Sequence, residues 1–130
     1  MQYANAYQES KRYAIESLSK GEVVVKLFEE ATKQLKMAIL FTEREENVKA
    51  FNAIGKCQKI ISSLNLSLDM QYPISIELNE MYGFIYTKLG EVGVSRDLQL
   101  MNDLWSLIRD LKVSFKEAEK INNSIKPRGL

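Results

Sequence analysis

The sequence predicts an all-α protein, folded as an antiparallel up-down four-helix bundle with a short, mobile N-terminal arm. Apolar residues recur at steps of three and four along four segments of twenty-odd residues, and no segment shows the alternation typical of a strand. The connections between the segments are short. Four amphipathic helices joined in this way bury their apolar stripes most simply when each helix lies antiparallel to the next.

The first two helices are predicted from an N-terminal signal and two apolar stripes. Ser19-Lys20-Gly21-Glu22 has the spacing of a capping box, so the first helix should begin there. Its stripe covers Val24–Ile39, and it should end near residues 42–46. Asn47 is expected to cap the second helix, whose stripe runs over Ala50–Leu68.

The third helix is predicted to begin at Pro73, because proline suits the first turn of a helix and disfavours helical angles at the residue before it. Its stripe covers Leu78–Val92, and the helix is expected to end at Gly90 to Gly93, because glycine tolerates the left-handed angles of a helix terminus.

The fourth helix should open at Ser95 and Asp97, carry a stripe over Leu98–Ala118, and end before Asn122-Asn123. The resulting division of the chain is an arm at residues 1–18, a bundle at 19–123 and a disordered tail at 124–130. A length of 130 residues, with 45% hydrophobic and 27% charged residues, is typical of one globular domain.

Composition excludes several classes of partner. The 18 basic and 17 acidic residues leave a net charge of +1, which gives little attraction to nucleic acid. No apolar run approaches the ~20 residues that a membrane span needs, and the first residues lack the order of a secretory signal. Cys57 is the only cysteine, which excludes an intrachain disulfide and fits a reducing compartment. We therefore expect a cytoplasmic protein.

Catalysis, metal ions and cofactors are not expected. The chain has no histidine, which removes the His-containing metal motifs of helical bundles and every Ser-His or Cys-His nucleophile. Acidic pairs such as Glu29-Glu30 lie on a polar helix face, without the apolar surroundings in which catalytic carboxylates are found. Gly55-Lys56 lacks the upstream glycine and the following Ser or Thr of a phosphate loop.

Apolar residues outside the four stripes suggest a surface that binds another protein. The apolar set of the fourth helix covers roughly 200° of its circumference, which is more than a surface helix needs. Single exposed apolar side chains are normal, but the set as a whole favours a groove that receives an amphipathic helix. The candidate partner-binding residues of the bundle are Met37, Leu40, Phe41, Val48, Leu66, Phe84, Leu100 and Leu107.

Several segments, in this order and spacing, resemble the flagellar secretion chaperone family FliS over nearly the whole chain. They are Ala6-Tyr7, Ser19 followed by Leu27-Phe28-Glu29-Glu30-Ala31, Ile60-Ile61-Ser62-Ser63-Leu64 to Leu68-Asp69, Leu78 to Tyr82 with Leu89, Leu107-Ile108-Arg109-Asp110-Leu111, and Phe115-Lys116-Glu117-Ala118. The chain departs from the family pattern at Ser19-Lys20-Gly21, at Met70 to Pro73, and at Phe115, where tryptophan is usual.

The resemblance implies a mostly monomeric cytoplasmic bundle that binds the C-terminal segment of flagellin and delivers it to the flagellar type III export apparatus. It adds the arm residues Tyr3, Ala6 and Tyr7 to the candidate partner-binding set. Ala6 and Tyr7 are apolar enough to occupy part of an empty groove, which is a hypothesis about the arm. The alternative is a structural or regulatory bundle that forms a homodimer through its spare apolar surface.

Overall fold

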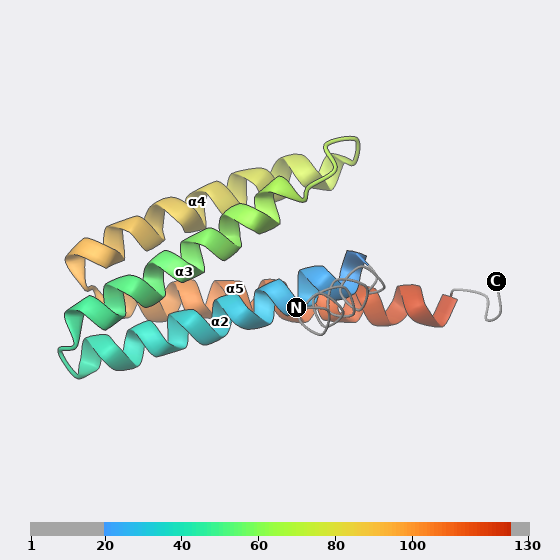
Figure 1. Cartoon of the computed structure of the whole chain (residues 1–130). Helices are drawn as coiled ribbons and strands as arrows, with labels where there is room; N and C mark the ends of the chain where they lie inside the picture. Colours follow the sequence, from blue (N-terminus) through green and yellow to red (C-terminus); the bar gives the residue numbers. More distant parts are fainter. Residues whose placement is uncertain (1–19, 126–130) are drawn as a thin grey trace, which may run out of the picture.

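Four helices make up residues 20–125, which are the part of the chain that the computed structural model describes (Figure 1). Their bounds are α2 Lys20–Glu43, α3 Asn47–Leu66, α4 Pro73–Ser95 and α5 Leu98–Ile125. Helix α2 packs against α3 and α5, α3 packs against α4, and α4 contacts α5 less extensively. The predicted four-helix bundle is confirmed. The arm at residues 1–18, the capping serine Ser19 and residues 126–130 lie outside the described range.

Two of the predicted helix starts hold at the level of single residues. Pro73 is in the first turn of α4, and Tyr72 before it is extended, with φ −91° and ψ 131°. Asp97 precedes α5, and its Oδ1 accepts a hydrogen bond from the backbone N–H of Leu100 at 3.1 Å. Ser95, which was also expected to open this helix, is instead the last residue of α4. Asn47, by contrast, is the first helical residue of α3 rather than its cap.

The predicted end of the third helix at Gly90–Gly93 is wrong. Helix α4 continues to Ser95, and Arg96 ends it in the left-handed region at φ 58°, with its N–H bonded to the carbonyl oxygen of Val92 at 3.0 Å. A Cβ at Gly93 would lie 3.6 Å from the ring of Phe51 on α3. This distance is an ordinary van der Waals contact, so Gly93 lies at the α3–α4 interface and does not terminate the helix.

Helix α5 is also longer than expected. It passes through Asn122-Asn123 and includes residues 124 and 125, which the sequence assigns to the tail. It is the longest helix, and no residue from 109 to 121 on it is buried. Up to residue 121, its last buried residue is Ile108. Residues 109–121 therefore contribute no fully buried side chain to the core.

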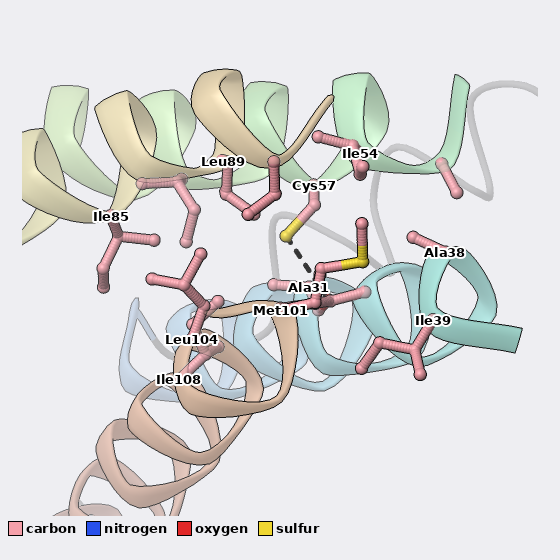
Figure 2. Packing of buried hydrophobic residues seen from close by; sticks show 14 of the residues in the cluster. Ala31, Ala38, Ile39, Ile54, Cys57, Ile85, Leu89, Met101, Leu104 and Ile108 are labelled. Atoms are coloured by element: carbon pink, nitrogen blue, oxygen red, sulfur yellow. Dashed lines mark hydrogen bonds between the residues drawn. The ribbon is translucent and has the colours of Figure 1, made fainter. Parts of the chain in front are cut away.

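The core lies toward the end of the bundle that carries the α2–α3 and α4–α5 turns. Figure 2 shows side chains from all four helices meeting there, among them Cys57, Ile85 and Met101, each with no exposed surface. The Cys57 thiol donates a hydrogen bond to the carbonyl oxygen of Ala31 at a donor–acceptor distance of 3.5 Å (Figure 2). Burial raises the pKa of this thiol to about 12, so it stays neutral at physiological pH.

The two halves of the bundle diverge away from that core. In Figure 1 the α3–α4 hairpin lies close to the α2–α5 pair at one end and separates from it toward the α3–α4 turn. The burial pattern agrees, because α5 buries side chains at Met101, Leu104 and Ile108 but none from residue 109 to residue 121. The bundle thus has a closed end and an open end, and the open end holds the candidate site.

Candidate binding cleft

A cleft of about 460 Å³ opens between the two diverging halves of the bundle. The start of α2, the end of α3, the α3–α4 turn, the start of α4 and the end of α5 all contribute to its lining. We call it the open-end cleft. Its lining residues are Gly21, Val24, Leu64, Ser67, Leu68, Asp69, Tyr72, Ile74, Ser75, Leu78, Tyr82, Phe115, Ala118 and Glu119.

Aromatic rings join the floor of the cleft to the core. The ring centroid of Phe28 lies 5.2 Å from that of Phe115 and 6.2 Å from that of Tyr82, in tilted arrangements that aromatic pairs favour. Phe28 is fully buried, whereas Phe115 is only partly buried and lines the cleft. Burial raises the pKa of the Tyr82 phenol to about 12, so this side chain is neutral at neutral pH.

The turn between α3 and α4 is held by its own hydrogen bonds. The Ser75 hydroxyl donates to the carbonyl oxygen of Asp69 at 2.6 Å, and Asp69 Oδ1 accepts from the backbone N–H of Gln71 at 3.0 Å. Tyr72 and Ile74 project from this turn with 62% and 59% of their surface exposed. The rim of the cleft is therefore apolar as well as its floor.

The cleft is suited to binding an apolar segment. Its charged lining residues are two carboxylates, Asp69 and Glu119, and the Glu119 carboxylate occupies the space beside Gly21 on α2. Within residues 20–125, no three His, Cys, Asp or Glu side chains gather as a group able to hold a metal ion. None of the described helices is both long enough and apolar enough to cross a bilayer.

The predicted partner-binding residues lie elsewhere on the bundle. Leu40, Val48, Leu66 and Phe84 are exposed, with 41%, 75%, 85% and 52% of their surface accessible. The other four in the bundle are partly buried and pack against the core: Met37, Phe41, Leu100 and Leu107. None of these eight residues lines the open-end cleft. Tyr3, Ala6 and Tyr7 lie outside the described residues, and the role of the whole set stays a prediction.

The residues that do line the cleft were missed because they belong to the regular apolar stripes. Val24, Leu64, Leu78 and Phe115 have the spacing of core residues, and periodicity alone does not reveal where two halves of a bundle diverge. One signal was available. Apolar residues crowd the turn around Tyr72, where an ordinary connection is polar.

Comparisons with known proteins agree over nearly the whole chain. The family model described as Flagellar protein FliS matches residues 3–122. The flagellar secretion chaperone FliS of Bacillus subtilis (strain 168) is 21% identical over 118 residues, which cover 91% of this chain and 89% of the relative. The protein of the same name from Salmonella typhimurium (strain LT2) is 26% identical over 113 residues, covering 85% of this chain and 84% of the relative. A family match of this extent, on a chain that folds as a helical bundle, shows that the protein belongs to the FliS family of flagellar secretion chaperones.

Proposed function

We propose that this protein binds the C-terminal segment of flagellin in the cytoplasm, keeps it from polymerising early, and escorts it to the flagellar type III export apparatus. The observation that carries the proposal is the open-end cleft, whose apolar floor is built by residues from all four helices. The names of the two relatives support a role in flagellar secretion. Nothing in this mechanism requires catalysis, because the protein acts by covering a surface.

The physical basis of the proposal is that apolar side chains of the flagellin tail can be buried in the chaperone before they are buried in the filament. A flagellin tail that orders only when it packs in the filament exposes apolar side chains beforehand, and an apolar cleft can order and cover them earlier. Ordering such a segment costs about 2–5 kcal/mol and is accompanied by burial of roughly 1,000–3,000 Å². An area of that size implies that the bound segment also contacts protein surface outside the cleft. The exposed rim residues Tyr72 and Ile74 offer apolar surface where that path would begin.

The test is a calorimetric titration of the protein with a synthetic flagellin C-terminal peptide, combined with circular dichroism. We expect heat of binding, a one-to-one stoichiometry and a gain of helix. The absence of both heat and added helix would count against the proposal.

A matched pair of variants locates the bound peptide. Ile74 and Ile76 are both on α4 and have similar exposed fractions, 59% and 55%, but only Ile74 lines the cleft. Ile74→Glu should weaken peptide binding at least tenfold, because it places a charge on the apolar rim. Ile76→Glu should change the affinity less than twofold. Equal effects of the two substitutions would show that the peptide binds elsewhere.

A homodimer is the second candidate function, and it is favoured by exposed apolar side chains that do not line the cleft. Val48, Leu66 and Val94 expose 75%, 85% and 80% of their surface. Sedimentation velocity over a hundredfold concentration range separates the two candidates. A chaperone should stay mostly monomeric until the flagellin peptide is added, whereas a structural dimer should associate without it.

A further inference from the structure

The open-end cleft has a carboxylate that no cation of the bundle balances. Asp69 lies in the α3–α4 turn, and the other charged lining residue, Glu119, lies on α5 in the opposite half of the bundle. The Glu119 carboxylate already occupies the space beside Gly21 on α2. No lysine or arginine lines the cleft, and no cation within residues 20–125 forms an ion pair with Asp69. Asp69 therefore presents a negative charge to whatever the cleft binds.

The α3–α4 turn restrains Asp69 through three hydrogen bonds. Its carbonyl oxygen accepts one from the Ser75 hydroxyl at 2.6 Å and one from the Tyr72 backbone N–H at 3.2 Å. Its Oδ1 accepts the third from the Gln71 backbone N–H at 3.0 Å. No donor among the described residues is hydrogen-bonded to Oδ2. The turn thus uses one carboxylate oxygen for its own structure and leaves the other available to a bound segment.

The chemistry of the lining indicates which kind of group Asp69 can bind. The Ser67 hydroxyl donates to the carbonyl oxygen of Leu64 at 2.7 Å, so both serine donors of the lining are satisfied by the backbone. An ionised carboxylate accepts hydrogen bonds and donates none, so a bound segment must supply the donor. A cationic donor is favoured over a neutral one, because charge-assisted hydrogen bonds are stronger and no cation in the lining repels it.

The surroundings of Asp69 suit the shape of a basic side chain. Leu68 and Leu78 are partly buried, Tyr72 is exposed, and all three line the same cleft. Lysine and arginine carry an apolar stem below the charge, so one such residue can cover apolar surface and still place its cation at a carboxylate. The bound segment also displaces water from around the pair, which strengthens the attraction between the two charges.

We propose that Asp69 determines the specificity of the open-end cleft by pairing with a lysine or arginine of the flagellin C-terminal segment. The pair sets the register in which that segment lies on the apolar floor. An acidic side chain at the same point of the segment would meet two carboxylates, Asp69 and Glu119, and would be rejected. This role rests on the proposed function, because it names the feature of flagellin that the cleft selects.

Asp69→Asn removes the charge and keeps the turn. The amide oxygen of asparagine can accept the bond from the Gln71 N–H, and the other two bonds involve only the backbone carbonyl of residue 69. The matched control is Glu77→Gln, which removes one charge from an exposed position of α4 outside the cleft. Calorimetric titration measures the affinity of each protein for the synthetic flagellin C-terminal peptide. The same titrations use peptides in which each lysine and arginine is changed to glutamine, one at a time.

At low ionic strength, Asp69→Asn should weaken binding of the original peptide about fivefold, near the upper limit for an ion pair at an exposed residue. The loss should fall below about twofold in about 1 M NaCl, where the screening length is about 3 Å. Glu77→Gln should change the affinity less than about twofold, because its charge makes no direct contact with the peptide.

A double-mutant cycle identifies the pair directly. One glutamine peptide should bind the unsubstituted protein about fivefold more weakly than the original peptide does, and should lose nothing further with Asp69→Asn. The peptide series is also measured against the unsubstituted protein alone, so the pairing is tested even where Asp69→Asn alters the turn. Thermal unfolding followed by circular dichroism shows whether it does.

Three results would overturn this role for Asp69. The first is that Asp69→Asn and every glutamine peptide bind as tightly as the originals. The second is that Asp69→Asn weakens all peptides by the same factor, because the side chain would then act on the turn or on the peptide backbone. The third is an equal loss in Glu77→Gln, which would indicate a general effect of charge. Failure of the unsubstituted protein to bind the original peptide would instead refute the proposed function itself.

Discussion

The indole Nε1 of Trp105 donates a hydrogen bond to the backbone carbonyl oxygen of Thr32 at 3.1 Å, which joins α5 directly to α2. Two cations flank the same ring, because the Lys36 ammonium and the Arg109 guanidinium lie 5.1 and 5.2 Å from ring centroids of Trp105. The contact lies within the half of α5 that buries side chains in the core. It therefore helps to hold the closed end of the bundle together.

Trp105→Phe should lower the free energy of unfolding by about 1–2 kcal/mol. The substitution keeps an aromatic ring but removes the interhelical hydrogen bond and weakens the cation–π contacts. Urea unfolding followed by circular dichroism measures the change, since the variant has lost the only tryptophan fluorophore. Lys36→Ala serves as the control and should cost less, because its ammonium is exposed. The reverse order of the two effects would contradict this account.

Phe115→Ala should weaken binding of the flagellin peptide at least tenfold, because it removes the aromatic part of the cleft floor. Phe115→Trp, which keeps an aromatic ring at this position, should retain binding. Titration calorimetry gives both affinities. Val113→Ala, two positions away on α5 and outside the open-end cleft, should leave the affinity unchanged. A similar loss in Val113→Ala would indicate a general effect on the helix.

Two glycines on α4 should respond differently to alanine. Gly83→Ala should stabilise the free protein by about 0.5–1 kcal/mol, because the new Cβ enters open space. Gly90→Ala should stabilise less, since its Cβ would lie 3.3 Å from Gln58 Nε2, which donates a hydrogen bond to the carbonyl oxygen of Tyr86. Thermal unfolding of the two variants, compared at the same concentration, tests the order. An equal gain at both positions would show that the Gln58 contact has no cost.

Stability should decline in alkaline solution and stay flat near neutral pH. Burial raises the pKa of Cys57 from 9.0 to about 12 and that of Tyr82 from 10.0 to about 12. Between each pair of values the unfolded chain has released a proton that the folded chain still holds, so the free energy of unfolding falls as pH rises. The contribution is complete below about pH 9 and is lost progressively above it. Urea unfolding at several pH values from 7 upward measures the decline, and a stability that rose above pH 9 would contradict it.

Cys57→Ala separates the two contributions. This variant should lose the part of the decline that begins at pH 9, while the part due to Tyr82 still begins near pH 10. A thiol reagent at pH 8 should react with the original protein only after denaturant is added, because the thiol is both buried and neutral. Rapid reaction without denaturant would mean that the thiol is accessible in the folded state.

Most of the fold was predictable because helical periodicity survives in every stripe. Buried residues such as Phe28, Ile61, Ile85 and Ile108 lie where the spacing of apolar residues placed them. The errors occur where tertiary contacts override local preference. Gly93 was expected to end a helix but packs beneath Phe51 instead.

The open-end cleft could not be predicted from the same patterns. Leu78 and Phe115 look identical to core residues in sequence, and only the divergence of the two halves of the bundle leaves them accessible. The residues chosen for lying off the stripes have a different environment. Leu66 is 85% exposed on the surface of α3, and Leu107 packs against the core. Hydrophobic periodicity indicates which face of a helix is apolar, but it does not indicate the distance between that face and the neighbouring helices.

Residues 109–121 of α5 extend past the buried Ile108 without a fully buried side chain among them. The backbone amides of this segment should therefore exchange with solvent deuterium through small local openings. The amides around Cys57 should exchange only through global unfolding, and therefore more slowly. A peptide bound against Phe115 would slow amide exchange in this segment of α5 alone. The protein can thus bind and release its partner while the closed end of the bundle stays folded.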